Sequence, residues 1–235
     1  MSLEPVQPLR VALAGNPNSG KTALFNLLTG SRQKVANYAG VTVERKEGRF
    51  RTPSGRPVRV LDLPGLYSLD PQSPDEQVTA DLLRGRLADE PAPDVVVAVL
   101  DSTDLRRHLR LALALRRTGL PLLLALNMSD LARRRGDQVD AAALSALLGV
   151  PVVETVAVER HGARALLAAL DRPVAMPVDA DRSDEELLEA AYRLLGELTA
   201  AGGITVSDRI DRFVLHPLLG PLLLGLTLFL VFQAV

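Results

Sequence analysis

The sequence predicts an α/β fold: a mostly parallel, six-stranded sheet flanked by helices, then a small helical module and an apolar C-terminal helix. Three observations support this prediction. Strand-like apolar runs alternate with helical patterns over residues 1–170, which is typical of right-handed crossovers in a parallel sheet. Residues 171–182 then become acidic and contain prolines, ahead of another helical pattern. Residues 218–235 are almost wholly apolar.

Short apolar runs mark the expected strands, and amphipathic or glycine-capped segments mark the expected helices. The strands are Val11–Ala14, Val41–Phe50, Val58–Leu61, Asp94–Leu100, Pro121–Leu126 and Pro151–Val153, the second and third forming an antiparallel hairpin. The helices are Ala23–Thr29, Leu105–Thr118, Gln138–Leu148 and Ala163–Leu170. A further helix is expected to begin after Ser183, followed by acidic first-turn residues, and to end at Gly202-Gly203.

Composition argues against several classes of protein. A net charge of −1 gives no electrostatic reason to expect nucleic-acid binding. With no cysteine, the sequence offers neither disulfides nor thiolate metal sites. His108 follows two arginines and is expected to be solvated. The N-terminus lacks an apolar h-region, so no cleavable signal peptide is expected.

The segment Gly15-Asn-Pro-Asn-Ser-Gly-Lys-Thr22 matches the phosphate-binding pattern G-x-x-x-x-G-K-[ST] and lies between an expected strand and an expected helix. Glycines let backbone N–H groups turn toward phosphate oxygens, and the helix N-terminus adds partial positive charge. Lys21 is expected on the β- and γ-phosphates and the Thr22 hydroxyl on Mg²⁺. The predicted contacts are Gly15, Asn16, Pro17, Asn18, Ser19, Gly20, Lys21, Thr22 and Ala23.

Two further segments fit the Mg²⁺ and γ-phosphate side of such a site. Asp62-Leu63-Pro64-Gly65 follows an apolar strand and fits a D-x-x-G element, in which the Asp holds Mg²⁺ through water and the Gly N–H meets the γ-phosphate. Alone, this tetrapeptide would be an ordinary turn. In Gly40-Val41-Thr42, the threonine is predicted to close on Mg²⁺ when γ-phosphate is present.

Base recognition is predicted from Asn127-Met128-Ser129-Asp130, which follows a continuous apolar run. An Asp carboxylate accepts hydrogen bonds from N1–H and the exocyclic amine of guanine, a donor pair that adenine lacks. In isolation this segment would be interpreted as a surface turn. Together with the phosphate-binding and D-x-x-G segments, it favours guanine recognition. The fifth sequence element of the GTPase set is expected at Val156-Ala157, where the backbone of Ala157 would contact the base.

These residues, together with Asp208-Arg-Ile-Asp-Arg-Phe-Val-Leu-His-Pro-Leu-Leu-Gly220, resemble the N-terminal part of FeoB, the bacterial ferrous iron transporter family. The sequence departs from that family's usual pattern at Val156, where serine is common. The resemblance implies a P-loop GTPase fold that binds GTP or GDP with Mg²⁺. It divides the chain into a GTP-binding domain (1–170), a helical module coupling nucleotide state (171–207) and a membrane entry (208–235).

The resemblance also implies a slow GTPase. Leu66 stands where some GTPases place a water-orienting glutamine. The expected catalytic residues are Lys21, Thr42 and Asn18, the last holding a stimulating K⁺ beside the phosphates. The expected metal ligands are Thr22 and Thr42 for Mg²⁺, Asp62 for Mg²⁺ through water, and Asn18 for K⁺. Whether the 171–207 module relays nucleotide state or only packs on the first domain stays open.

The apolar segment 218–235 would form a helix of about 27 Å, close to the thickness of bilayer hydrocarbon. Arg209 and Arg212 precede it, which places residues 1–207 on the cytoplasmic side of the bacterial inner membrane. The expected partners are guanine nucleotide, the lipid bilayer and the rest of the transporter, with small Feo accessory proteins and further copies of the chain as candidates. Two alternatives remain: a membrane-tethered switch without transport, and a soluble ribosome- or tRNA-associated GTPase.

Overall fold

The computed structural model describes residues 7–38, 42–87, 90–137, 139–177, 182–201 and 219–234. Several expectations fall outside these ranges: the placement of Gly40 and Val41, the helix end at Gly202-Gly203, and the positions of Arg209 and Arg212.

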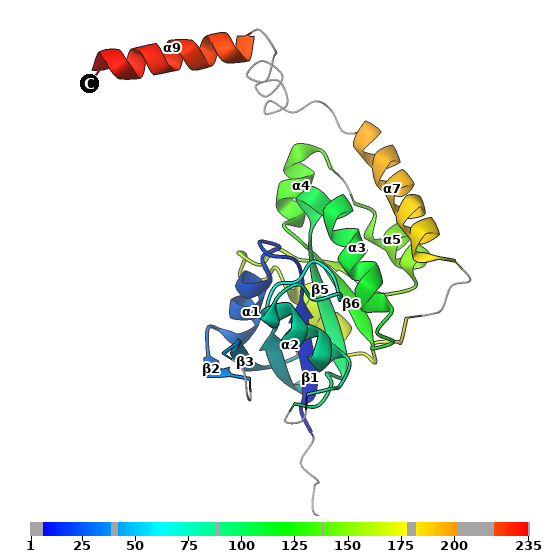
Figure 1. Cartoon of the computed structure of the whole chain (residues 1–235). Helices are drawn as coiled ribbons and strands as arrows, with labels where there is room; N and C mark the ends of the chain where they lie inside the picture. The colour runs from blue at the N-terminus through cyan, green and yellow to red at the C-terminus, as the bar shows by residue number, and fades with distance from the viewer. Residues whose placement is uncertain are drawn as a thin grey trace, which may run out of the picture.

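The described strands form one seven-stranded sheet in the order β2-β3-β4-β1-β5-β6-β7 (Figure 1). Neighbours from β4 to β7 pair in parallel, whereas β2 and β3 pair antiparallel with their neighbours. The strands are β1 Leu9–Ala14, β2 Gln33–Asn37, β3 Glu44–Arg51, β4 Pro57–Asp62, β5 Val95–Asp101, β6 Leu122–Asn127 and β7 Val152–Glu154.

The predicted parallel α/β sheet is confirmed, but the strand count of six was wrong because β2 was missed. All five residues of β2 are exposed, so the strand carries no apolar alternation that a sequence pattern could reveal. Among the described strands, β2 pairs only with β3. The predicted hairpin is formed by β3 and β4, with β3 beginning at Glu44 rather than Val41.

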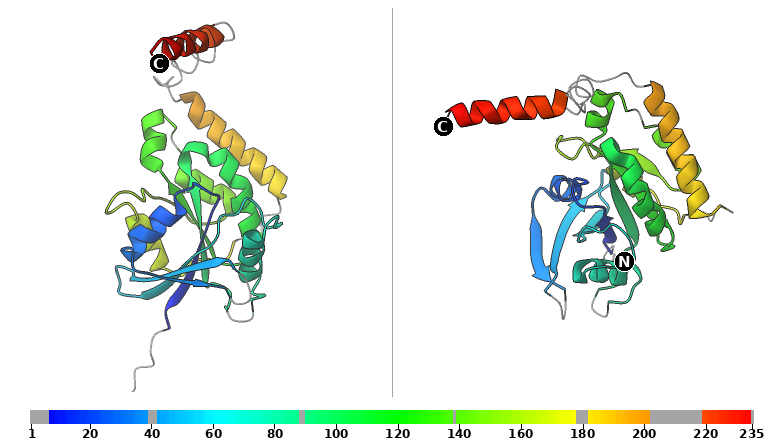
Figure 2. Two further views of the ribbon diagram at one scale, coloured as in Figure 1. Left: turned by 60° about the vertical axis from the view of Figure 1, so that its left-hand side comes forward. Right: turned by 45° about the horizontal axis from the view of Figure 1, so that its top comes forward.

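Helices cover both faces of the sheet and bury two separate cores (Figures 1 and 2). One face packs on α1 and α6 through Phe25 and Leu166, and the other on α2, α3, α5 and α7. The helices are α1 Lys21–Thr29, α2 Pro74–Leu83, 3-10 helix η1 Ser102–Asp104, α3 Leu105–Arg116, α4 Ser129–Arg135, α5 Ala141–Leu148, α6 Arg164–Leu170, α7 Asp184–Ala201 and α9 Leu219–Ala234. Gly30 ends α1 in a left-handed conformation, as predicted.

The first helix of the 171–207 segment, α7, begins with a reciprocal cap. The Glu186 N–H donates to Ser183 Oγ at 3.2 Å, and the Ser183 N–H donates to Glu186 Oε2 at 2.9 Å. Its apolar side, with Leu187 and Ala191 fully buried, packs into the core that α3 and α5 share. α7 is therefore packed on the sheet domain.

His108 was expected to be solvated, and this is wrong. It lies on the inward side of α3 and is 5% exposed. The positions of Leu105, Leu109 and Ala112 show why: His108 falls in the same i, i+3, i+4 stripe that faces the core. Burial lowers the pKa of His108, because desolvation disfavours the charged imidazolium.

Several apolar side chains of α9 are largely exposed, among them Leu224, Leu228, Phe229, Leu230, Val231 and Phe232. None of the helices in the described ranges combines the length and hydropathy needed to cross a membrane.

Candidate nucleotide-binding site

The segment Gly15–Gly20 forms the turn between β1 and α1, and Lys21 and Thr22 begin the helix, so backbone N–H groups gather at the N-terminus of α1. Asn18 and Gly20 are both left-handed, at φ 66° and φ 80°. At Gly20, an added Cβ would collide with the Asn127 side chain, whose Nδ2 is the nearest atom. Glycine is therefore required at this position for two reasons. It allows the left-handed turn, and it lets the predicted base-reading segment Asn127–Asp130 (the base box) approach the predicted phosphate-binding segment Gly15–Thr22 (the phosphate loop).

The side chains of Lys21, Thr22 and Asp62 converge beside this turn, although Asp62 lies about forty residues further along the sequence. Lys21 Nζ donates to Asp62 Oδ1 in a buried ion pair, and Thr22 Oγ1 donates to Asp62 Oδ2 at 3.1 Å. Asp62 is the last residue of β4, which pairs with β1, so the sheet register itself brings the carboxylate to the loop. A primary amine, a hydroxyl and a carboxylate at one point suit a metal-bound polyphosphate.

Two adjoining hollows open here, of about 270 and 360 Å³, and both are bordered by Lys21, Thr22 and Gly65. The larger is otherwise lined by the phosphate loop, including Asn16 and Asn18. The D-x-x-G segment is held against that loop: the Leu66 N–H donates to the Gly15 carbonyl oxygen at 3.2 Å.

The smaller hollow shows residues that the sequence reading missed. The hollow is lined by Val43, Glu44, Lys46 and Asp75 together with Lys21. Asp75 lies in the first turn of α2, where an N-cap serine and a following proline were available as a helix-start signal.

Asn127 connects the end of β6 to two other segments, one at Ser19 in the phosphate loop and one at Ala157. Its Nδ2 donates to the Ser19 carbonyl oxygen at 3.0 Å, and its Oδ1 accepts from the Ala157 N–H at 3.0 Å. The next residue, Met128, is left-handed at φ 58°, which turns the chain into α4 and places Asp130 in the first helical turn, partly exposed. Val156 is held by its own N–H, which donates to the Gly162 carbonyl oxygen at 3.0 Å.

Thr42 is exposed and does not border either hollow, although its neighbours Val43 and Glu44 border the smaller one. Just before it in sequence, Tyr38 is buried against Val43 and Val78 of α2. Burial raises the pKa of Tyr38 to about 12, because desolvation disfavours the phenolate. The structure thus ties the segment around Thr42 to α2.

Leu66 is fully buried in the core under α2 and α3. Its side chain is therefore shielded from solvent. Its backbone N–H contacts the loop through the Gly15 carbonyl oxygen.

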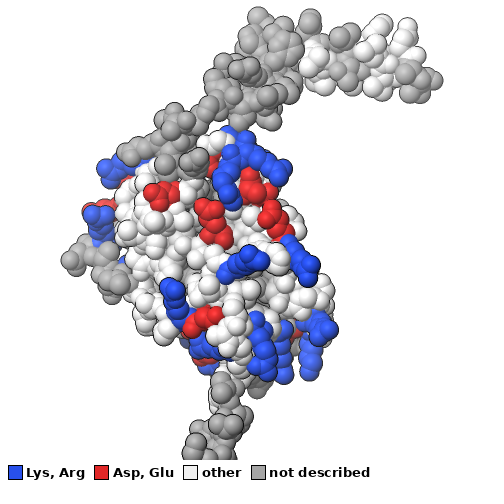
Figure 3. Space-filling model, turned by 180° about the vertical axis from the view of Figure 1, so that it is seen from behind, with Lys and Arg blue, Asp and Glu red and all other residues white. Residues whose placement is uncertain are grey.

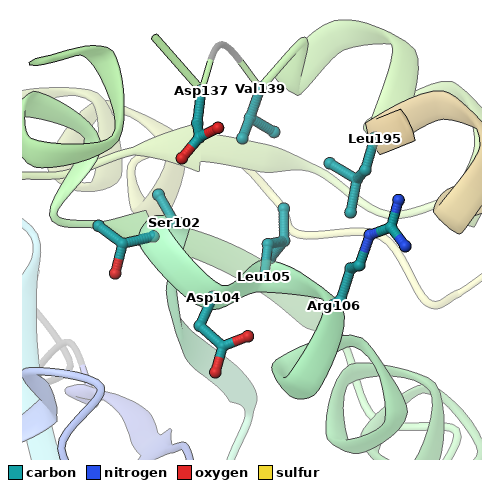
Figure 4. Close-up of a pocket in the computed structure, with 8 residues that line it drawn as sticks. Ser102, Asp104, Leu105, Arg106, Asp137, Val139 and Leu195 are labelled. Atoms are coloured by element: carbon teal, nitrogen blue, oxygen red, sulfur yellow. The ribbon is translucent and has the colours of Figure 1, made fainter. Parts of the chain in front are cut away.

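A separate pocket of about 140 Å³ lies away from the phosphate loop, where α7 meets η1 and the start of α3 (Figure 4). Asp137 and Val139, just beyond α4, face it from one side, and Leu195 and Arg106 border it on another. Because α4 begins at the base box, this pocket marks where α7 approaches the segment that follows that box.

Comparison with known proteins identifies the family. A family model described as ferrous iron transport protein B matches residues 9–170. The chain belongs to the FeoB family. It is 42% identical over 207 residues to the Fe(2+) transporter FeoB of Escherichia coli K12, covering 86% of this chain and 25% of that protein. It is also 49% identical over 148 residues to a Fe(2+) transport protein A/FeoB fusion protein of Porphyromonas gingivalis, covering 63% of this chain and 17% of the fusion. The chain thus spans a quarter or less of these relatives.

Solved FeoB structures share its fold. The cytosolic domain of L. pneumophila FeoB is 39% identical with a TM-score of 0.65, over 74% of this chain and 68% of that one. The FeoB G-domain of Methanococcus jannaschii is 39% identical with a TM-score of 0.60, over 72% and 98%. An S. thermophilus NFeoB mutant bound to GDP is 33% identical with a TM-score of 0.64, over 87% and 86%.

Proposed function

We propose that this chain binds GTP and GDP with Mg²⁺ and hydrolyses GTP slowly, as the cytoplasmic part of a ferrous iron transporter in the bacterial inner membrane. The convergence of Lys21, Thr22 and Asp62 at the N-terminus of α1 carries the proposal. Related FeoB domains are described as bound to GDP, which supports guanine nucleotide as the ligand.

The donor set fits Mg²⁺. Thr22 and Asp62 bring hydroxyl and carboxylate oxygens to one side of Lys21, and oxygen ligands are what Mg²⁺ requires. Thr22 and Thr42 would hold the ion directly and Asp62 through water. Bound there, Mg²⁺ would neutralise charge on the β- and γ-phosphates.

The phosphates would lie in the turn Gly15–Thr22, with Ala23 continuing the helix behind them, and Lys21 would move from Asp62 to the phosphates. The backbone of Asp62-Leu63-Pro64-Gly65 would face the γ-phosphate. Binding of GTP would draw Thr42, with Gly40 and Val41, toward the site.

The base would lie near Asn127, Met128 and Asp130, with Val156 and Ala157 alongside. Asp130 in the first turn of α4 would read the two donors of guanine. Asn127 would hold the base loop to the phosphate loop through the bonds that it already makes to Ser19 and Ala157.

Hydrolysis would depend on groups other than the side chain of Leu66, which is buried. Asn18 and Asn16 both border the larger hollow, and Asn16 Oδ1 is buried with no hydrogen-bond partner among the described residues. Amide oxygens suit a monovalent cation. We therefore include K⁺, held by Asn18, as a stimulating ion.

Membrane attachment would come from the apolar residues of 208–235, with the bilayer and the rest of the transporter as partners. Small accessory proteins and a second copy of the chain are further candidates. Nucleic acid is disfavoured by the net charge of −1. The alternative of a membrane-tethered GTPase without a transport role predicts the same nucleotide chemistry.

The experiment is GTP turnover by the full chain in K⁺ and in Na⁺. Because Asn18 is left-handed, Asn18→Gly removes the amide while keeping the backbone conformation, which alanine would strain. We expect faster turnover in K⁺ for the parent, no K⁺ advantage for Asn18→Gly, and similar GDP affinity for both. Equal rates in the two salts for the parent would refute the K⁺ proposal, and no turnover in either would refute GTPase activity.

A further inference from the structure

We propose that the free edge of β2 is a docking surface for an extended, acidic segment of a partner protein, which would extend the sheet by one strand. β2 is the last strand in the order on its side, and among the described residues it pairs only with β3. Figure 2 (right) shows it along the outer border of the sheet. Such an edge offers unpaired N–H and C=O groups to an incoming strand.

No described strand pairs with the outer edge of β2. Each residue of Gln33–Asn37 is exposed, and Val35 is 54% exposed. The sequence puts neither proline nor glycine in this strand, and its five residues pair in unbroken register with β3. Lys34 is the one charged residue of the strand, and no proline interrupts its edge.

The surface around this edge is basic. Arg32, Lys34 and Arg49 border a shallow hollow, and the one carboxylate in its lining, Glu47, is already engaged. Glu47 accepts from Arg45 at 2.8 Å and from Arg59 at 2.9 Å. Arg49 also lies 3.8 Å from Glu47, so the three cations that line the hollow exceed its one carboxylate. Figure 3 shows the molecule from behind, where Lys and Arg side chains are interspersed with Asp and Glu.

An acidic strand fits this surface better than the other occupants. A second copy pairing through its own β2 would set Lys34 and Arg32 close to like charges, which is destabilising. An anionic lipid headgroup could accept from the N–H groups and the cations, but it would leave the strand's C=O groups unpaired. An extended segment carrying Glu or Asp satisfies both the backbone edge and the charges.

The C-terminal end of β2 adjoins the loop that contains Thr42. Asn37 ends the strand, the Tyr38 N–H donates to the Val43 carbonyl oxygen at 3.0 Å, and Thr42 lies within this loop. If Thr42 moves when GTP binds, the end of β2 moves with it. Docking would then differ between GTP- and GDP-bound protein, a consequence that rests on the proposed function, whereas the docking itself does not.

The test uses the full chain and a defined probe: a ten-residue peptide of alternating Glu and Val, with a Lys–Val peptide of the same length and phosphatidylglycerol vesicles as comparisons. Binding is measured by fluorescence anisotropy, and protection of the β2 amides by hydrogen exchange. We expect the acidic peptide to bind at least tenfold tighter than the basic one and to slow exchange in residues 33–37.

Two double charge reversals locate the surface. Arg32→Glu with Lys34→Glu should weaken the acidic peptide at least tenfold. Arg110→Glu with Arg134→Glu, both exposed on helices elsewhere, should leave it unchanged. Equal loss in both variants, no protection of residues 33–37, or selective binding of vesicles at β2 would each overturn the proposal. Failure here with nucleotide binding intact would leave the proposed function standing, because GDP affinity is measured separately on the same variants.

Discussion

Asn127 and Ser19 are joined by a hydrogen bond of 3.0 Å between the Asn127 side-chain amide and the Ser19 carbonyl oxygen. The bond links the end of β6 to the phosphate loop, so the segment expected to read the base helps to shape the segment expected to hold the phosphates. Asn127 is 1% exposed, so both its amide groups must be satisfied inside the protein.

Asn127→Ala should therefore weaken nucleotide binding and lower stability together. It leaves the Ser19 carbonyl and the Ala157 N–H without their partner, which costs about 1–3 kcal/mol for each buried unsatisfied group. Calorimetric GDP binding and urea unfolding measure the two effects. Asn37→Ala, at an exposed position of β2, is the matched control and should change neither.

Gly20→Ala should lower the free energy of unfolding more than Gly30→Ala, a change at another left-handed glycine. Gly30, at φ 62°, has open space around its Cα, so Gly30→Ala carries only the backbone strain of about 1–2 kcal/mol. Gly20→Ala adds a collision with Asn127. In an Asn127→Ala background the total Gly20→Ala penalty should shrink toward the Gly30→Ala value. A Gly20→Ala penalty unaffected by that background would show that the contact has no energetic weight.

Leu66→Gln should not create a catalytic glutamine. The Leu66 side chain is fully buried in the core, so the amide would be placed there unsatisfied. We expect a loss of about 2–4 kcal/mol in unfolding free energy and no gain in GTP turnover. Leu131→Gln, at a 40% exposed position, should be close to neutral. Faster turnover with unchanged stability would mean that this segment can turn outward.

Tyr38 should make stability fall at alkaline pH. Its pKa is raised to about 12 in the folded protein, against an ordinary value near 10. Between these values the unfolded chain releases the phenolic proton while the folded chain keeps it, so the free energy of unfolding decreases as pH rises above 10. Tyr38→Phe should remove part of this decrease in urea melts at pH 9 and 11. Tyr67→Phe, at a 51% exposed ring, should not.

Much of the fold follows from local patterns. The buried strands β1, β5 and β6 are continuous apolar runs, and Gly30 and Ser183 carry recognisable cap signals. β2 could not be predicted in this way, since its pairing depends on the backbone of β3 rather than on its own side chains. His108 was misjudged because its two arginine neighbours face solvent while its own position faces the core.

For the site, motif spacing predicted that Lys21, Thr22 and Asp62 would meet, because parallel strands end at one edge of the sheet. The sequence could not show that Asp75 and Glu44 border the same hollow, or that Leu66 turns inward. These depend on how α2 and β3 pack. Thr42, Gly40 and Val41 remain predicted participants.

Calorimetric titration of the full chain and of Asp130→Asn with GDP, XDP and ADP in Mg²⁺ tests the central claim most directly. We predict that the parent binds GDP and neither of the others at comparable affinity. The variant should lose about 1–3 kcal/mol of GDP binding through the mismatched amide and should gain binding to XDP. Equal binding of ADP and GDP by the parent, or undiminished GDP binding by the variant, would contradict a guanine-specific site at Asn127–Asp130.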